Sequence, residues 1–312
     1  MKLSRWARIS VETLWLTLLC IGLSGCEQDQ TKTVNLANRA PLPTGVHQSN
    51  LTRLNLAVGS FLTPEQGYGY YQQLIGYLSE QLALNVTVVD PGNYQKLNHL
   101  LETGKVDVAF VCSGPYVEGH DRFGLVLLAA PVVKGEPVYF SNLIVPARSP
   151  AQSLADLRGK TFAFTDPQSN SGSLVVKNKL SRMGVAPEDF FDSSTYTYAH
   201  DRSIHAVADH LVDGAAVDSL IWDYMAATEP DLTNQVRVIE RYGPYAIPPV
   251  VAAPHVAPEL REKIRRVLLT MHETPSGREI LQAMHVERFD DIDDSAYESI
   301  RQILTPDMQG SR

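Results

Sequence analysis

The sequence predicts an α/β protein whose globular part consists of two lobes. Strand-like and helix-like segments alternate from residue 54, and the same alternation begins again near residue 140. A proline-rich segment at 244–249 then leads back to one more strand and two helices. Strands that alternate with helices favour a mainly parallel sheet covered on both faces. Because the alternation begins again near residue 140 and the chain later returns to a strand and two helices, we predict two such units, joined by two crossings of the chain.

The first unit begins with a predicted strand at 54–58. Apolar residues at helical spacing between Tyr70 and Leu82 predict the helix that follows. The next predicted elements are a strand at 86–89, a helix at 94–102 and a short buried strand at 106–112, which opens into a loop at 113–116.

The second unit begins with strand-like residues at 140–146. Its further predicted elements are a strand at 161–165, a helix at 174–183, a helix at 204–211, a strand at 215–218 and a stretch that starts at 236–239. The chain then returns to the first unit, with a strand at 250–252 and helices at 258–274 and 276–284. About 260 residues follow residue 50, which is enough for two lobes with their own cores.

The first 25 residues have the layout of a secretory signal. A positive region (Lys2, Arg5, Arg8) precedes an apolar stretch at 14–23, and small residues lead to Cys26. The string Leu-Ser-Gly-Cys resembles the cleavage and lipidation site of bacterial lipoproteins. A transmembrane anchor is the alternative, but the apolar stretch is shorter than the ~20 residues that a spanning helix needs.

We therefore expect residues 1–25 to be removed and Cys26 to become a lipidated N-terminus. Residues 26–50 are polar and lack periodicity, which predicts a flexible tether. The mature protein is expected at the periplasmic face of a bacterial membrane or at the cell surface. Residue 27 is glutamate rather than aspartate, so the choice between inner and outer membrane stays open.

Charge and cysteine content exclude two classes of protein. The net charge of −8 becomes −10 without residues 1–25, which carry three basic side chains and one acidic side chain. Such a chain lacks the basic face that nucleic acids require. With Cys20 removed and Cys26 lipidated, Cys112 is left alone, which excludes a disulfide framework. Because no basic group adjoins Cys112 in its apolar stretch, we expect a small buried side chain rather than a nucleophile.

A polar turn at 166–173 connects a predicted strand to a predicted helix. Ser169, Asn170 and Ser171 offer side-chain donors there, next to the unpaired N–H groups of the helix start. The helix dipole adds roughly half a positive charge at the same place. No lysine or arginine lies in the turn, so the pattern indicates a small oxyanion held by neutral donors. The alternative is that these serines only cap the helix.

Several further strings occur in an order typical of one family. They are Asn93-Tyr94, Gly104 to Ala109, Gly114-Pro115-Tyr116, Tyr139-Phe140-Ser141, Leu154 to Phe164, Asp166 to Gly172, and His200 followed by Ala206-Val207. Over about residues 52–305 the chain resembles the periplasmic phosphate, phosphite and phosphonate-binding proteins, the solute receptors of ABC importers. Each string alone is weak, whereas all of them in sequence are specific.

The resemblance implies a two-lobed periplasmic-binding-protein fold of type II-like topology, with the ligand in the interlobe cleft and closure about hinge strands. It assigns residues 51–141 and 246–312 to lobe 1 and residues 142–245 to lobe 2. It implies a monomeric protein with no cofactor and no metal, whose partner is an ABC permease. Ligand sites in such sheets lie at the carboxyl ends of strands, where Ser113, Ser169 and Asp218 are predicted to fall.

The resemblance also implies roles for individual side chains. Ser169, Asn170 and Ser171 would donate to the oxyanion, and Tyr94 and Tyr139 would add hydroxyl donors and aromatic walls. His200 would be a further donor, and Asp218 would accept a proton that the oxyanion still carries, because two bare anions repel. Ser113 and Tyr116 are expected as a second tier of pocket residues.

These assignments have structural alternatives. Tyr94 and Tyr139 could serve core or hinge packing. A lone histidine such as His200 is more often a surface or core residue than a ligand contact. Asp218 could bond a nearby loop.

Two departures from the family pattern bear on the ligand. Asn170 replaces the family's central threonine, which keeps a donor and adds an acceptor. The second crossing reads Ile247-Pro248-Pro249, without the acid that members binding aminoalkylphosphonates carry there. An aminoalkylphosphonate is therefore disfavoured, and phosphate, phosphite or a compact phosphonate is expected.

Three function classes follow from these observations. The expected function is a lipid-anchored receptor that hands an oxyanion to a permease. The alternative is a receptor that reports an oxyanion, or another small anion, to a membrane sensor partner. Catalysis is disfavoured because the sequence shows no metal-spaced cluster and no convincing nucleophile–base pair.

Overall fold

The structure is a computed structural model that describes residues 53–59 and 64–305. These residues belong to one compact unit, Asn50–Arg312. The expected signal peptide, the tether and the lipidation of Cys26 lie outside the described residues. Among the described helices, none combines the length and the apolar composition that crossing a membrane requires.

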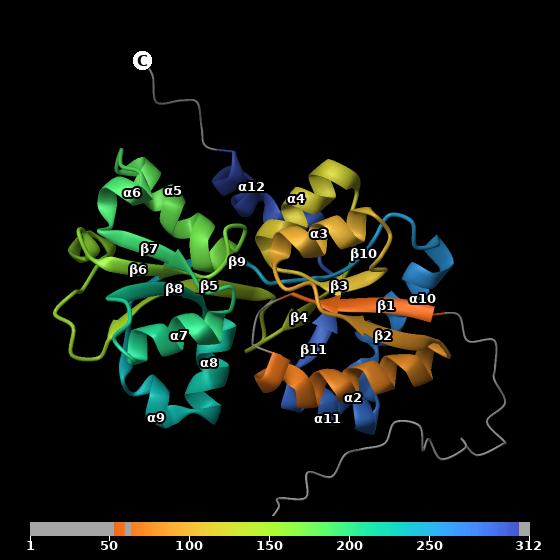
Figure 1. The fold of residues 1–312 in the computed structure, drawn as a ribbon. Helices are drawn as coiled ribbons and strands as arrows, with labels where there is room; N and C mark the ends of the chain where they lie inside the picture. The colour runs from red at the N-terminus through yellow and green to blue at the C-terminus, as the bar shows by residue number, and fades with distance from the viewer. Residues whose placement is uncertain (1–52, 60–63, 306–312) are drawn as a thin grey trace, which may run out of the picture. The chain divides into compact units, whose positions relative to one another are not determined.

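The first sheet has the strand order β11-β4-β10-β3-β1-β2. Helices α3 and α4 cover one face of this sheet, and α2 and α11 cover the other (Figure 1). We call the sheet and its helices the first lobe. Its elements are β1 (Arg53–Val58), α2 (Pro64–Leu82), β2 (Asn85–Val89), α3 (Tyr94–Glu102), β3 (Val108–Phe110), α4 (Ser113–Phe123), β4 (Val126–Val132), β10 (Val250–Ala252), α10 (Pro258–Leu269), α11 (Pro275–Ala283), β11 (Arg288–Asp290) and α12 (Glu298–Leu304).

The second sheet has the order β7-β6-β8-β5-β9. Figure 1 shows α5 and α6 on one of its faces and α7, α8 and α9 on the other. We call this the second lobe. Its elements are β5 (Val138–Pro146), β6 (Thr161–Phe164), α5 (Val175–Arg182), α6 (Pro187–Phe190), β7 (Ser193–Tyr196), α7 (His200–Ala208), β8 (Gly214–Asp218), α8 (Ser219–Thr228), α9 (Pro230–Thr233) and β9 (Val236–Ala246). Short helical turns lie at Leu154–Leu157, Asn170–Leu174, Met271–Glu273 and Asp294–Tyr297.

Both sheets are mixed, whereas the sequence predicted mainly parallel ones. Strands joined by helical crossovers run parallel, namely β1 with β2 and β3, and β6 with β7 and β8. Strands next to the crossings run antiparallel to their neighbours: β10 to β3 and β4, β11 to β4, and β5 to β8 and β9. Period and composition identify a strand but do not give its direction, which depends on how the chain enters the sheet.

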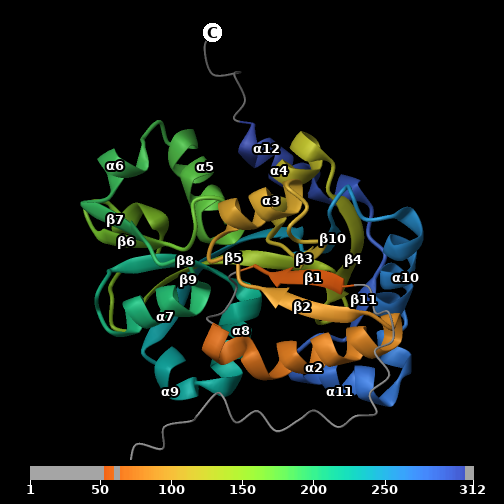
Figure 2. The ribbon, with the colours of Figure 1, turned by 45° about the vertical axis from the view of Figure 1, so that its right-hand side comes forward.

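The two crossings of the chain run side by side. The first passes from β4 to β5, and the second passes from β9 to β10. Strands β5 and β9 pair from Val138 and Ala246 to Pro146 and Val236. The Ile247 N–H donates to the Pro137 carbonyl at 3.0 Å, which ties the two crossings together. In Figure 2 these strands lie between the helices of the two lobes.

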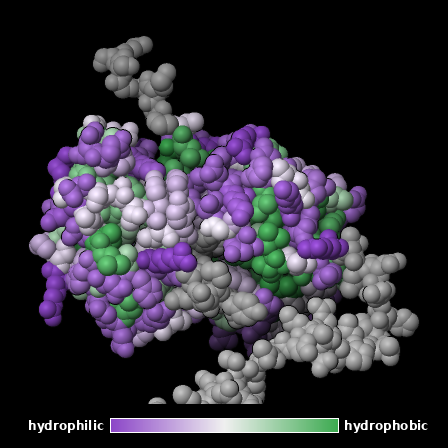
Figure 3. Space-filling view, viewed as in Figure 1, coloured by the Kyte–Doolittle hydropathy of each residue, from purple (hydrophilic) through white to green (hydrophobic). Residues whose placement is uncertain are grey.

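Apolar side chains fill the space between each sheet and its helices. The core of the first lobe includes Leu54, Leu56 and Val108, and the core of the second lobe includes Phe162 and Phe164, all nearly inaccessible to solvent. On the face seen in Figure 3, hydrophobic residues form separate small groups within a mainly hydrophilic surface. The described chain therefore buries its apolar residues in the way a soluble α/β domain does.

Candidate functional site

Most residues predicted for the site lie at or near helix starts that follow strands, whereas Tyr139 lies on β5. Tyr94 and Ser113 are the first residues of α3 and α4 in the first lobe. In the second lobe Ser169 caps the turn before α5, His200 is the first residue of α7, and Asp218 caps α8. The sequence predicted a loop at 113–116 and a helix beginning at 204, so two of these helix starts appear only in the structure.

Helix starts supply positive potential without basic side chains. Each one has backbone N–H groups free of intrahelical partners and the positive end of a helix dipole. Among the described residues, the buried polar and charged side chains include no lysine and no arginine. An anion at this place would therefore be held by neutral donors and dipoles, as the sequence pattern indicates.

The two lobes contact each other directly at these helix starts. The Tyr94 N–H of α3 donates to Asp166 Oδ2 of the second lobe at 3.2 Å. A side chain at Gly114 would place its Cβ 2.5 Å from the Gln168 carbonyl, so only glycine allows α4 to approach the second lobe so closely. The Gln168 side-chain amide donates to the Glu118 carboxylate of α4. These contacts describe a closed arrangement.

The turn at 169–174 combines a capping residue with polar atoms that have no partner. Ser169 Oγ accepts the Gly172 N–H at 3.0 Å, so this serine does cap the helix. Asn170 Nδ2 donates to the Tyr139 hydroxyl at 3.0 Å, whereas Asn170 Oδ1 and Ser171 Oγ, both buried, have no hydrogen-bond partner. The turn is π-helical, a widened geometry that often marks functional sites.

His200 is buried as a neutral ring with one free donor. Its Nδ1 accepts the Asp218 N–H at 3.1 Å, so the neutral ring carries its proton on Nε2. Nε2 is buried and has no partner. Burial lowers the pKa of His200 from 6.5 to about 3, so the imidazole stays neutral at physiological pH.

Asp218 is a buried acid with one free oxygen. Its Oδ1 accepts the Leu220 N–H at 2.7 Å, while Oδ2 has no partner. Burial raises the pKa of Asp218 from 3.8 to about 7, although hydrogen bonds from the backbone of α8 oppose the shift. At neutral pH this carboxyl can therefore either donate a proton to a ligand oxygen or accept one from it.

Five of the partnerless buried polar atoms of the second lobe come from the turn at 169–174 and from the starts of α7 and α8. They are Asn170 Oδ1, Ser171 Oγ, Ser173 Oγ, His200 Nε2 and Asp218 Oδ2, and we call their five residues the polar site. Folded proteins satisfy nearly all buried polar atoms, so a cluster of exceptions indicates a missing polar partner. Three hydroxyl or imidazole donors, one amide acceptor and one acid of near-neutral pKa match an oxyanion that still carries a proton.

Ser113 and Tyr116, predicted as a second tier of pocket residues, have hydrogen-bond partners within the protein. Ser113 Oγ donates to the Ala246 carbonyl at 2.7 Å. The Tyr116 hydroxyl donates to Asp294 at 2.6 Å, and its ring packs edge-on against Tyr297, with ring centroids 4.5 Å apart. Ser113 and Tyr116 therefore fix the crossing and the C-terminal segment. Cys112 is buried, and burial raises its pKa to about 11, which fits a small core residue.

The sequence reading missed Ser173 and Thr165. Ser173 lies at the end of the predicted turn, but its hydroxyl was not singled out as a donor; in the structure it is buried and has no partner. Thr165 Oγ1 lies 3.2 Å from His200 Nδ1, and a Cβ at Gly172 would fall 2.5 Å from it. Thr165 thereby positions both the imidazole and the turn. Within the described residues, no group of three or more His, Cys, Asp or Glu side chains could hold a metal ion.

Comparison with known proteins gives a consistent result. A family model described as "ABC transporter, phosphonate, periplasmic substrate-binding protein" matches residues 56–297. The phosphonates-binding periplasmic protein of Escherichia coli K12 is 27% identical over 240 residues, which are 75% of this chain and 70% of that protein. The phosphate-import protein PhnD of Mycolicibacterium smegmatis is 24% identical over 277 residues, which are 85% and 82% of the two chains.

Solved structures confirm the fold class. A binding protein component of an ABC phosphonate transporter from Pseudomonas aeruginosa matches with a TM-score of 0.77 and 23% identity, covering 81% of this chain and 86% of that one. PhnD1 from Prochlorococcus marinus, solved with methylphosphonate, matches with a TM-score of 0.73 and 18% identity, covering 81% and 97%. The two-lobed α/β prediction is thus confirmed.

Proposed function

The chain belongs to the family of periplasmic substrate-binding proteins of phosphonate ABC transporters, and on this premise we propose that it captures a small phosphorus oxyanion at the polar site. The ligand is phosphate, phosphite or a phosphonate, and the protein delivers it to a membrane permease. The observation that carries the proposal is the cluster of five partnerless buried polar atoms.

Four groups of the polar site have definite roles in this proposal. Ser171, Ser173 and the His200 Nε2–H donate to oxygens of the anion. Asp218 and the ligand share one proton, which removes the repulsion between two bare anions. Selection for an oxyanion that can carry a proton follows from this shared proton, because a fully deprotonated anion of similar shape would face the Asp218 carboxylate.

Closure is coupled to binding through contacts near the same turn. Asn170 bonds to Tyr139 of the crossing strand β5, and Asp166, which precedes the turn, bonds to the first lobe at Tyr94. The first bond lies within the second lobe and the second bond joins the lobes, so a ligand that orders residues 169–173 favours the closed arrangement, in which the Tyr94–Asp166 bond forms. Tyr94 and Tyr139 then act as closing and wall residues.

The domain division and the anchor belong to the same proposal. Residues 1–25 form the signal, Cys26 carries lipid, and residues 26–50 tether the lobes formed by 51–141 with 246–312 and by 142–245. The protein acts as a monomeric receptor at the periplasmic face of a membrane and not as an enzyme. Reporting to a membrane sensor is the alternative, and capture with the tagged protein distinguishes the two by recovering permease or sensor components.

Titration calorimetry of the mature protein tests the ligand class. We expect phosphate, phosphite or methylphosphonate to bind more tightly than 2-aminoethylphosphonate, because the second crossing lacks an acid for the ammonium group. Sulfate is the control of similar shape, and we expect it to bind at least about tenfold more weakly than phosphate, since it carries no proton for Asp218. Tightest binding of 2-aminoethylphosphonate would contradict the expected ligand class, and absence of binding by every phosphorus oxyanion would refute the proposed function.

A further inference from the structure

A cavity of about 570 Å³ adjoins the polar site and shares Asp218 with it. Both lobes contribute to its walls: α2, β3, β4 and the segment from α11 to β11 on one side, and α8 on the other. Most of the wall is hydrocarbon, supplied among others by Phe110, Leu220, Ile221, Pro248, Met284 and Phe289.

The cavity and the polar site meet at Asp218. Asp218 borders both, with Oδ2 free and Oδ1 bonded to the start of α8. Phe110 borders the cavity, and its carbonyl and the Tyr94 ring both approach Gly59, where an added Cβ would be 3.2 Å from the Phe110 carbonyl oxygen and 3.1 Å from Tyr94 Cε1. Burial raises the pKa of the Tyr94 hydroxyl, and the Asp218 carboxyl adds to the shift, which is consistent with a phenol close to Asp218.

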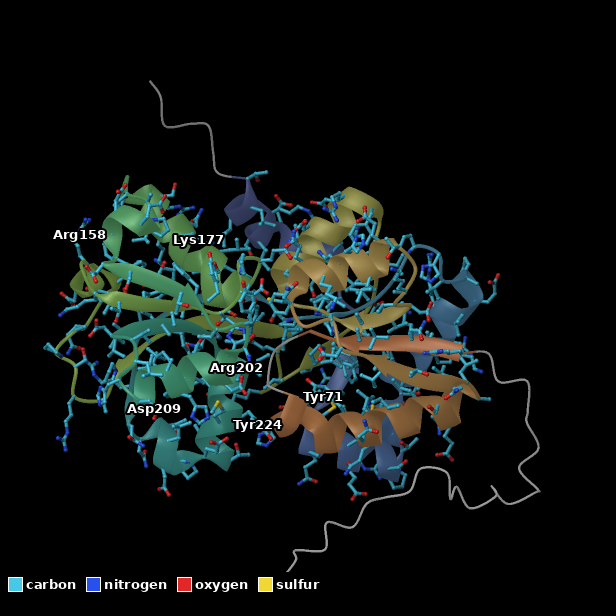
Figure 4. All side chains as sticks on the ribbon, in the orientation of Figure 1. Tyr71, Arg158, Lys177, Arg202, Asp209 and Tyr224 are labelled. Carbon is cyan, nitrogen blue, oxygen red and sulfur yellow. The ribbon has the colours of Figure 1, made fainter. Side chains whose placement is uncertain are left out.

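Contacts between the lobes also border the cavity. Lys134, in the first crossing, forms an ion pair with Asp223 of α8, with 2.6 Å between Nζ and Oδ2. The rings of Tyr224 and His285 meet edge to face, with centroids 5.4 Å apart. Tyr71 of α2 and Tyr224 of α8, labelled in Figure 4, border the cavity from opposite lobes. A group in the cavity would therefore contact both lobes.

Apart from Asp218, the acidic side chains around the cavity already have partners. Asp223 is paired with Lys134, and Glu287 accepts the Gly135 N–H at 3.1 Å. Pro248 contributes hydrocarbon in the crossing that, by the family resemblance, carries an acid in members that bind aminoalkylphosphonates. The cavity therefore offers an apolar surface rather than a site for a second charge, and its volume lies within the roughly 300–1,000 Å³ of small-molecule sites.

We propose that this cavity holds an apolar substituent of a phosphonate whose phosphonate group occupies the polar site. The inference rests on the proposed function and extends the ligand class from compact oxyanions to phosphonates that carry an aryl or branched alkyl group. A bare phosphate or methylphosphonate would leave most of the cavity without a ligand group. A hydrocarbon group would exchange water for contact with Phe110, Leu220 and Phe289.

Calorimetry with phenylphosphonate and methylphosphonate tests the inference. We expect wild-type protein to bind phenylphosphonate at least about tenfold more tightly, because burial of the ring adds apolar contact area. Met284→Trp should reduce this preference at least about tenfold, since the indole fills the cavity. The matched control is Met183→Trp. Met183 also lies at a helix end, is 49% exposed and does not line the cavity. This substitution should leave the preference for phenylphosphonate unchanged.

A second variant that fills the cavity keeps the test valid if Met284→Trp does not fold. Val133→Trp fills the cavity from the first crossing and should reduce the same preference. If methylphosphonate binds and phenylphosphonate binds no more tightly, the apolar subsite is refuted while the proposed function stands. Tighter binding of 2-aminoethylphosphonate than of phenylphosphonate would also overturn it. If no phosphorus oxyanion binds, the proposed function itself fails.

Discussion

Asp218→Asn is expected to raise the stability of the ligand-free protein at pH 8 by up to about 4 kcal/mol. The folded state holds the Asp218 proton up to a pKa of about 7, whereas the ordinary value is 3.8. The carboxyl therefore contributes stability that is fully present below pH 3.8 and is lost as the pH rises through about 7. Asparagine keeps the acceptor for the Leu220 N–H and places a neutral amide at the free oxygen.

The pKa shift of His200 changes the stability of the protein in the opposite direction over an overlapping range of pH. Its folded pKa of about 3 lies below the ordinary 6.5, so its contribution to stability is present above pH 6.5 and is lost as the pH falls toward 3. Between pH 3.8 and 6.5 the two slopes oppose each other in the wild-type protein. Asp218→Asn removes the opposing slope of Asp218, so the stability of the variant should rise more steeply with pH across this range than that of the wild type.

Urea unfolding of both proteins from pH 4 to pH 8 measures the effect. Asp209→Asn is the control, because it removes an exposed carboxylate at the end of α7 (Figure 4) and should change stability by less than about 0.5 kcal/mol. A stability difference between wild type and Asp218→Asn that is absent at pH 8, or equally large at pH 4, would contradict the account of Asp218.

Ser171→Ala is expected to weaken methylphosphonate binding by about 1.5–3 kcal/mol, roughly 10- to 150-fold. The Ser171 hydroxyl is buried and has no partner in the ligand-free structure. Its removal should therefore leave the melting temperature of the ligand-free protein unchanged or slightly higher. This combination separates a ligand contact from a structural serine, whose loss lowers stability.

Ser203→Ala provides the matched comparison. Ser203 is equally buried, but its Oγ lies 2.7 Å from Thr197 Oγ1 in a hydrogen bond. Its replacement should cost about 1 kcal/mol of stability and change affinity by less than about threefold. Calorimetry and thermal unfolding of the two variants give both readouts. If Ser171→Ala binds like the wild type, residues 169–174 serve only as a helix cap.

The sequence predicted the parts of the site that lie close together in the chain. Strand, polar turn and helix around Ser169 could be read directly, and the helix predicted at 94–102 coincides with α3. His200 and Asp218 were assigned through the resemblance, because no local pattern shows that the Asp218 N–H fixes the imidazole tautomer. That contact depends on the packing of α7 beside β8.

Features that depend on distant segments could not be predicted. Strand direction in the mixed sheets depends on the two crossings, which carry no periodicity of their own. The walls of the cavity combine residues from both lobes, from Tyr71 to Phe289. In the sequence, the apolar character of these residues indicates only that they belong to a core. Tyr116 matched a family string but bonds to Asp294 in the C-terminal segment. In each case tertiary packing decides the role of the residue.

The crystal structure of the mature protein with methylphosphonate tests the central claim most directly. We predict phosphonate oxygens within about 3 Å of Ser171 Oγ, Ser173 Oγ and His200 Nε2. Asp218 Oδ2 should lie at hydrogen-bond distance from one of the same phosphonate oxygens. Methylphosphonate bound elsewhere, with these buried atoms still lacking partners, would contradict the assignment of the polar site.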